Sequence, residues 1–223
     1  MLKRGMFISL EGVEGCGKST QAKLLAEHIV DLGYSFVLTR EPGGTPIAER
    51  IREVLLEPRN TDMTDVTELL LYLASRSQHV NQLILPALAE GKVVICERFS
   101  DATFAYQGYA RGLDPSDLER VNKMSTGGLE PDLTLLLDLK AEDGLSRKRS
   151  DDYIPDRLES ESIKFHNKVR KGYLAIARRF PQRVKVIDAE GTIAEVHHRV
   201  RKCVDQWLVA YQPQRMFTSF GKA

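Results

Sequence analysis

One octapeptide near the start of the chain constrains the fold more than any other feature. Gly12-Val13-Glu14-Gly15-Cys16-Gly17-Lys18-Ser19 matches the pattern G-x-x-x-x-G-K-[ST]. An apolar run over residues 6–10 precedes it, and a stretch with Ala22, Leu25 and Ile29 at helical spacing follows it. A strand, a glycine-rich turn and a helix are the setting in which this pattern binds phosphates. The octapeptide therefore predicts an α/β fold with a phosphate site where the first strand ends.

The chemistry of this loop indicates a nucleoside triphosphate. Its glycines let the backbone curl so that successive N–H groups converge on phosphate oxygens. Lys18 is expected to reach the β- and γ-phosphates, Ser19 to place its hydroxyl on Mg²⁺, and the helix N-terminus to add partial positive charge. The residues expected to hold ATP are Gly12, Val13, Glu14, Gly15, Cys16, Gly17, Lys18, Ser19 and Thr20.

The rest of the chain alternates β-rich runs with amphipathic stretches. Strands are expected at residues 6–11, 36–40, 93–97, 133–139 and 184–188, and helices at 19–32, 47–56, 65–90, 116–126, 158–179 and 193–208. Pro86 is expected to kink or split the third helix, and Thr192 with Glu195 forms a capping box before the last. This alternation predicts a three-layer α/β/α fold, in which helices surround a five-stranded parallel sheet. With no repeat and no Gly/Ser linker, we expect one domain over residues 1–223, with the tail 209–223 unassigned.

Composition narrows the classes of function. The chain has 32 Lys+Arg and 31 Asp+Glu, a net charge of +1, which argues against coating nucleic acid through bulk charge. The basic run over residues 163–187 is predicted to be a solvated helix face. No apolar run approaches the roughly 20 residues that span a bilayer, and the three cysteines match neither a disulfide framework nor zinc spacing. These features predict a cytoplasmic protein without a membrane or nucleic-acid partner.

Two further segments favour phosphoryl transfer over the other activities that share this loop. Glu97 and Asp138 end hydrophobic strands and are candidates for the second metal carboxylate, and Arg98 follows Glu97 where open α/β sheets bind ligands.

The other classes of protein that share the phosphate loop fit the sequence less well. A GTPase would carry N-K-x-D, but the nearest string, at residues 122–125, lacks the Asp. An ATP-driven motor would usually be larger or strongly charged. A small-molecule kinase needs a lid that excludes water and supplies arginines. Residues 142–159, with Arg147, Arg149 and Arg157, have that character.

Three motifs in order resemble those of bacterial thymidylate kinases. They are E-G-V-E-G-C-G-K-S-T at residues 11–20, T-R-E-P-G-G-T at 39–45 and D-A-T-F-A-Y-Q-G at 101–108, and the resemblance extends over about residues 5–208. It implies a P-loop nucleoside monophosphate kinase that transfers the γ-phosphoryl group of ATP to dTMP with Mg²⁺. It also implies a homodimer formed through helices 65–90 and 116–126.

The resemblance also implies roles for single residues. Lys18, Arg98, the lid arginines Arg147 and Arg149, and Glu14 would form the catalytic group, and Ser19 and Glu97 would hold the metal. Tyr72 would stack on thymine, Arg76 would bond the pyrimidine edge, and Tyr106 would pack against the sugar. The residues expected around dTMP are Glu14, Pro42, Tyr72, Arg76, Arg98, Thr103, Tyr106 and Gln107.

The sequence leaves three questions open. It does not decide which lid arginine meets the transferring phosphoryl group. The second question is raised by two departures from the family pattern: the strand-end pair is Glu97-Arg98 where the family usually has Asp-Arg, and Tyr72 stands where it usually has Phe. A kinase for another nucleoside monophosphate, or a nucleotide-binding regulator without catalysis, remains an alternative.

Overall fold

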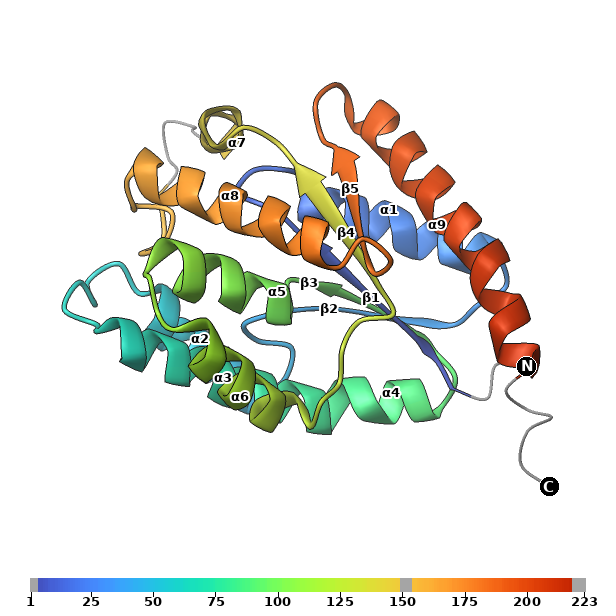
Figure 1. The fold of residues 1–223 in the computed structure, drawn as a ribbon, viewed down its shortest axis with the longest axis horizontal. Helices are drawn as coiled ribbons and strands as arrows, with labels where there is room; N and C mark the ends of the chain where they lie inside the picture. The colour runs from blue at the N-terminus through green and yellow to red at the C-terminus, as the bar shows by residue number, and fades with distance from the viewer. Residues whose placement is uncertain (1–3, 149–153, 218–223) are drawn as a thin grey trace.

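Five parallel strands form the centre of the structure (Figure 1), a computed structural model that describes residues 4–148 and 154–217. The strands are β1 (Met6–Glu11), β2 (Phe36–Arg40), β3 (Val93–Glu97), β4 (Leu133–Asp138) and β5 (Val184–Asp188). They pair in the order β2-β3-β1-β4-β5, and each neighbouring pair is parallel. The predicted five-stranded parallel sheet is confirmed.

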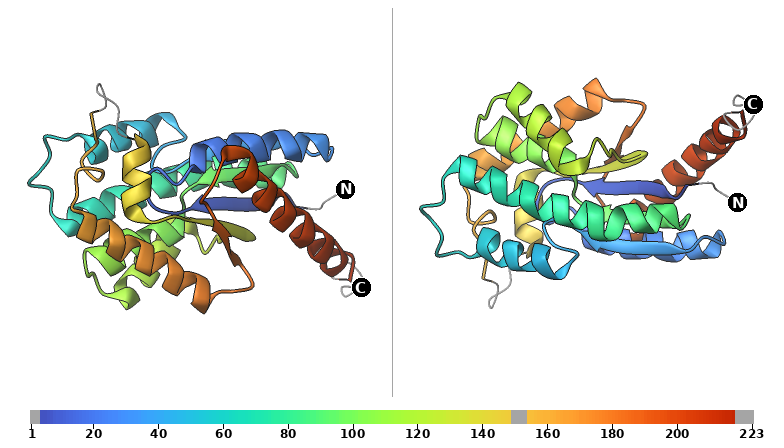
Figure 2. Two further views of the ribbon diagram at one scale, coloured as in Figure 1. Left: turned by 90° about the horizontal axis from the view of Figure 1, so that it is seen from above. Right: turned by 90° about the horizontal axis from the view of Figure 1, so that it is seen from below.

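The alternation of side chains along β1 explains why helices cover both faces of the sheet. Met6, Ile8 and Leu10 belong to the buried cluster that includes residues of α1 (Lys18–Asp31), whereas Phe7 packs against Val80 and its neighbours on the other face. Figure 2 shows α1 and α8 (Ile163–Arg179) on opposite sides of the strands. A strand buried on both faces reads as a nearly continuous apolar run, as the sequence of β1 does.

The remaining helices follow the predicted order with different bounds. They are α2 (Pro46–Leu56), α3 (Asp65–His79), α4 (Leu85–Ala89), α5 (Ser100–Thr103), α6 (Pro115–Thr126), α7 (Ala141–Lys148) and α9 (Ile193–Phe217), with π-helical η1 (Val80–Ile84) and η2 (Phe104–Ala110). The predicted helix 65–90 is divided into α3, η1 and α4. The division lies just before Pro86, whose nitrogen cannot donate a helical hydrogen bond, and the Leu85 N–H bonds to the Val80 carbonyl instead.

The prediction for the helix at 158–179 was wrong at its start. The helix begins at Ile163, where the Ser162 hydroxyl accepts a hydrogen bond from the Phe165 N–H at 3.3 Å. The preceding residues form a separate turn, in which the Asp156 carboxylate accepts from the N–H groups of Leu158 and Glu159, each at 2.9 Å. The capping box of the last helix is confirmed, because Thr192 and Glu195 exchange hydrogen bonds of 2.7 and 3.3 Å.

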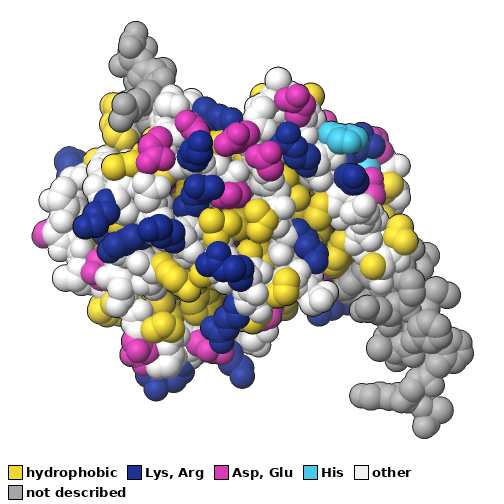
Figure 3. Space-filling model, turned by 45° about the horizontal axis from the view of Figure 1, so that its top comes forward, with side chains coloured by type: hydrophobic (Ala, Val, Ile, Leu, Met, Phe, Trp, Pro, Cys, Tyr) yellow, Lys and Arg dark blue, Asp and Glu magenta, His cyan; other side chains and the backbone are white. Residues whose placement is uncertain are grey.

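The part of the basic run over residues 163–179 lies on a solvated helix, as predicted. The prediction was wrong for the end of the run, because Arg183 pairs with the buried Asp101 at 2.7 Å and Lys185 lies in β5. In α8, Phe165, Val169, Tyr173 and Ile176 are buried, and the lysines and the last two arginines are exposed. Figure 3 shows Lys and Arg side chains gathered across one face of the molecule, with Asp and Glu among them. Within the described residues, no helix combines the length and the apolar character needed to cross a membrane.

Candidate active site

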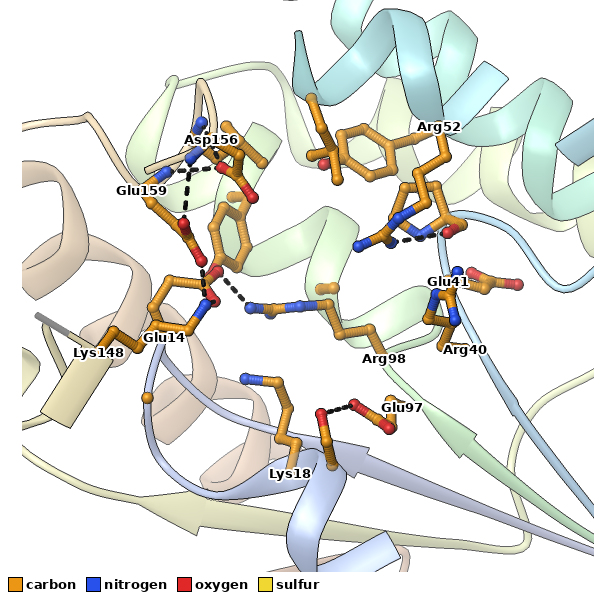
Figure 4. Close-up of a pocket in the computed structure, with 18 of the residues that line it drawn as sticks. Glu14, Lys18, Arg40, Glu41, Arg52, Glu97, Arg98, Lys148, Asp156 and Glu159 are labelled. Carbon is orange, nitrogen blue, oxygen red and sulfur yellow. Dashed lines mark hydrogen bonds and ion pairs between the residues drawn. The ribbon is translucent and has the colours of Figure 1, made fainter. Parts of the chain in front are cut away.

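A cavity of about 550 Å³ opens where β1 and β3 end (Figure 4). The loop after β1, the end of β3, α3, η2 and the lid segment all contribute to its wall. The predicted site residues that line it are Glu14, Gly15, Gly17, Lys18, Ser19, Thr20, Pro42, Tyr72, Arg76, Glu97, Arg98, Thr103, Tyr106, Gln107 and Arg147. Gly12, Val13 and Cys16 are not in the wall, and the last two are buried beneath the loop. Arg149 lies outside the described residues.

The phosphate loop is held in shape by its own backbone and by the lid. Gly15 has a φ of 67°, and a Cβ atom there would collide with the carbonyl oxygen of Gly144 in α7. Only glycine permits both this conformation and this close approach. Lys18 Nζ donates to the carbonyl oxygens of Gly12 and Val13 at 3.1 and 2.8 Å. The ammonium group therefore lies at the mouth of the loop, at the start of α1.

Ser19 and Glu97 meet beside the loop. The Ser19 hydroxyl donates to Glu97 Oε2 at 2.6 Å, because the parallel register of β1 and β3 brings the end of β3 next to the loop. Among the described residues, no group of three or more His, Cys, Asp or Glu could form an all-protein metal cage. Mg²⁺ usually takes one or two protein oxygens together with phosphate oxygens and waters. A hydroxyl and a carboxylate at the foot of a phosphate loop fit that ion.

Arg98 occupies the middle of the cavity, where Figure 4 shows its side chain extending over Lys18 toward Glu14. Its backbone has a φ of 65°, a conformation that is uncommon outside glycine and concentrates at functional sites. The guanidinium donates to the Glu14 carboxylate, to the Gly12 carbonyl at 3.2 Å and to the Tyr173 hydroxyl at 3.1 Å, and it lies over the Tyr106 ring at 4.9 Å. The cation is thus fixed before any ligand binds.

Glu14 is ionised in this setting. Burial acts to raise the pKa of its carboxyl, but the positive charges of Arg98, Lys18 and Lys148 outweigh burial and lower the pKa to about 2. The Tyr106 hydroxyl also donates to Glu14, at 3.0 Å. Glu14 therefore orients both Arg98 and Tyr106.

The other end of the cavity presents an aromatic ring and several amide, hydroxyl and guanidinium groups. Tyr72 is half-buried there, and Thr103 and Gln107 are buried. Arg76, 1% exposed, donates to Glu41 at 2.7 Å, to Thr103 at 2.8 Å, to Asn122 at 2.6 Å and to the Phe99 carbonyl at 3.0 Å. Among the described residues these bonds use four of its five N–H groups, and one on Nη2 remains.

The lid arginines take different positions. Arg147 lines the cavity and donates to the Ala189 carbonyl, with both terminal nitrogens at 3.3 Å. Arg157 is not part of the cavity wall. It forms an ion pair with the buried Glu68 at 2.7 Å and donates to the Leu55 carbonyl at 2.9 Å. Arg157 therefore anchors the lid segment to α2 and α3.

Comparisons with known proteins identify the family. A family model described as thymidylate kinase matches residues 10–200. A thymidylate kinase of Syntrophotalea carbinolica is 54% identical over 199 residues, which cover 87% of this chain and 92% of that protein. Another from Geobacter sp. is 46% identical over 224 residues, covering 98% and 96%. The chain belongs to the thymidylate kinase family. A crystal structure of thymidylate kinase from Ehrlichia chaffeensis agrees, with a TM-score of 0.74, 35% identity and coverage of 90% of this chain and 98% of that one.

Several residues that line the cavity were not predicted from the sequence as site residues. Arg40 and Arg52 lie near Pro42, whose carbonyl accepts from Arg52 at 2.9 Å, and Lys148 forms an ion pair with Glu159. Arg40 and Lys148 lie inside segments already noted, T-R-E-P-G-G-T and the lid, so they could have been found there. Arg52 stands in an ordinary amphipathic helix, and nothing in its local sequence distinguishes it.

A buried carboxyl behind the loop yields a pH prediction. Burial, reinforced by the charge of Asp101, raises the pKa of Glu11 from 4.5 to about 7, although Arg98 and bonds from Tyr173 and Phe99 act to lower it. Below pH 4.5 this carboxyl is protonated in both the folded and the unfolded chain. The stability that its folded environment contributes is lost as the pH rises toward 7.

We therefore expect the free energy of unfolding of the wild type to fall relative to that of Glu11→Gln between pH 5 and 8. Urea midpoints measured at both pH values test this. Glu14→Gln is the control, because Glu14 stays ionised over this range and its replacement leaves the slope unchanged. Equal slopes for wild type and Glu11→Gln would contradict the assignment.

Proposed function

We propose that this protein transfers the γ-phosphoryl group of ATP to dTMP, forming dTDP and ADP with Mg²⁺ in the cytoplasm, where ATP is supplied. One observation carries the proposal. A single cavity joins the phosphate loop, a fixed arginine and a pocket with an aromatic ring and hydrogen-bonding groups. Donor and acceptor phosphates bound in it would meet at Arg98. Membership of the family supports the same reaction.

The residues suit phosphoryl transfer between two phosphates. The attacking oxygen of a monophosphate is already anionic, so no strong general base is needed. The barrier lies in bringing anions together, and fixed cations in a closed cavity lower it. Lys18, Arg98 and Arg147 would supply those cations, and Glu14 would keep Arg98 in place. Bound Mg²⁺, held through Ser19 and Glu97, would neutralise charge on the donor phosphates.

The acceptor end favours a thymine nucleotide. Tyr72 would stack on the base, and Arg76, Thr103 and Gln107 would contact it, while Pro42 would line the base pocket. Tyr106, held by Glu14, would pack against the sugar and disfavour a 2′-hydroxyl. The two sides of this pocket come from α3 and from α5 with η2, which Arg76 joins through its bond to Thr103.

An ADP-release assay with ATP and Mg²⁺ tests the proposal. Release that depends on added dTMP supports it. If ATP binds but no monophosphate stimulates ADP release, the protein is a regulator without catalysis and the proposal is wrong. The assay also needs an ATPase blank without acceptor, since water can replace a missing acceptor.

A homodimer is part of the proposed function. Val66, Leu70 and Leu85 project from the long helix α3–η1–α4 at 55%, 56% and 42% exposure, and Met124 of α6 is 79% exposed. Met124 and Leu85 line the same shallow depression. Exposed apolar side chains along one helix and beside a shared depression are typical of an interface between subunits.

We expect a solution mass near twice 25.2 kDa for the wild type. Met124→Glu places a charge in the interface and should shift light-scattering mass toward the monomer. Ile154→Glu is the control, because Ile154 is 81% exposed but belongs to the lid segment. A monomeric wild type, or a dimer indifferent to Met124→Glu, would contradict this interface.

A further inference from the structure

Glu68 is a buried carboxylate that the reaction does not use directly. It lies on α3 with its side chain 1% exposed, and it does not line the cavity. Three side chains bond it: Gln107 donates from Nε2 at 2.8 Å, Arg111 from Nη2 at 3.0 Å, and Arg157 forms an ion pair at 2.7 Å. A carboxylate is buried this completely only when charged and polar partners satisfy it.

The bond from Gln107 fixes the orientation of an amide in the acceptor pocket. A carboxylate can only accept, so the NH₂ group of the Gln107 carboxamide must face Glu68. The carbonyl oxygen Oε1 then lies on the other side of the amide, and no described residue donates to it. Gln107 also lines the cavity. Glu68 therefore determines that Gln107 presents a hydrogen-bond acceptor, and not a donor, to the pocket.

The same pocket also contains a complementary donor. Arg76, which lines the same pocket, retains one N–H beyond its bonds to the described residues. Thymine presents the acceptor O4 beside the donor N3–H, whereas cytosine presents the donor N4–H₂ beside an acceptor N3. A donor from Arg76 and an acceptor from Gln107 match thymine or uracil and oppose cytosine at both positions.

Glu68 also connects the acceptor pocket to the lid. Arg157, from the lid segment, reaches the same carboxylate, and its backbone N–H bonds to the Leu56 carbonyl at 3.2 Å. Arg111 completes the group; it bonds Glu68, pairs with Asp65 at 3.4 Å and lies over the Phe165 ring at 4.5 Å. The anchoring of the lid and the orientation of Gln107 therefore depend on one side chain.

We propose that Glu68 is a positioning residue for base selection, which fixes Gln107 so that its carboxamide oxygen accepts from N3–H of a thymine or uracil ring while Arg157 of the lid docks on the same carboxylate. The inference rests on the proposed function for the identity of the pocket. It assigns to Glu68 a role in choosing the acceptor as well as in stabilising the fold.

Glu68→Gln tests the proposal, because an amide at this position can face Gln107 with either its oxygen or its NH₂ group. Calorimetric Kd values for dTMP and dCMP are measured, together with Tm and ATP binding. We expect the preference for dTMP over dCMP to fall at least about tenfold. Asp65→Asn is the matched control, since Asp65 lies on the same helix and contacts Arg111 without contacting Gln107. Its preference should stay within about twofold of the wild type.

A swapped pair separates positioning from stability. Glu68→Gln with Gln107→Glu keeps one carboxylate and one carboxamide in the same volume, and position 107 then always presents an acceptor oxygen. We expect the dTMP preference to return to within about threefold of wild type, since pairs in contact are coupled. If Glu68→Gln does not fold, the swapped pair alone tests the proposal, and a retained preference for dTMP over dCMP supports it.

An unchanged preference in folded Glu68→Gln, or a lost preference in the swapped pair, would overturn the proposal. Turnover is recorded separately. Absence of dTMP phosphorylation by the wild type would refute the proposed function, whereas an active wild type with an indifferent Glu68→Gln would refute only the role of Glu68.

Discussion

Replacing Lys18 by alanine is expected to lower kcat by about 10³-fold, the upper end of the range for loss of one fixed electrostatic group. The side chain closes the loop through bonds to Gly12 and Val13, which hold its ammonium group at the phosphate loop. Negative charge develops on the leaving phosphate oxygen as the phosphoryl group departs, so the loss should appear in kcat more than in KM.

Lys23→Ala is the control for this experiment. Lys23 is an exposed lysine on the same helix at the rim of the cavity, and it forms no bond to the loop carbonyls. We expect it to retain most of the activity, with Tm and ATP binding measured for both variants. Comparable losses in Lys18→Ala and Lys23→Ala would show that the position of the charge in the loop is unimportant.

Arg98→Lys is expected to lower kcat/KM for dTMP by about 10² to 10³-fold although the positive charge is kept. Arginine presents a planar fork that here bonds Glu14, Gly12 and Tyr173 at once, and lysine offers a single ammonium group on a flexible stem. The variant should therefore lose the fixed direction of the charge while Glu14 keeps a counter-ion.

The matched control is Arg170→Lys. Arg170 forms a two-pronged bond with Asp138, at 2.7 and 2.9 Å, but it does not line the cavity. We expect its kcat/KM to change by less than about threefold, because pairs that are partly exposed contribute little. If Arg98→Lys behaves like Arg170→Lys, the guanidinium geometry is not part of catalysis.

The strands and the phosphate loop were predictable because their signals are local. The apolar run of β1, the glycines and Lys18 follow one another in the chain, and parallel pairing then brings Glu97 to Ser19. The lid over residues 142–159 was inferred from its charge together with the phosphate loop, and its role stays a prediction. The start of α8 was predicted too early, because the Asp156 carboxylate holds Leu158 and Glu159 in a separate turn and the Ser162 hydroxyl caps the helix only after it.

The interior of the acceptor pocket could not be predicted in the same way. The partners of Arg76 come from positions 41, 99, 103 and 122, which only the tertiary fold brings together. Glu68 reads in the sequence as an ordinary acid in the first turn of a helix. Arg157 resembles Arg147 in its lid context, yet it faces Glu68 and not the cavity. Residues of one type take different roles when their neighbours are distant in sequence.

A competition experiment tests the central claim most directly. Equal concentrations of dTMP, dCMP, CMP and GMP are incubated with limiting ATP, Mg²⁺ and the protein, and the diphosphates are separated and quantified; AMP is tested by itself through its consumption, because its product is ADP. We predict that dTDP forms in large excess and that its amount matches the ADP released. Predominance of any other diphosphate would contradict the assignment of the pocket, and release of ADP without any new diphosphate would contradict phosphoryl transfer itself.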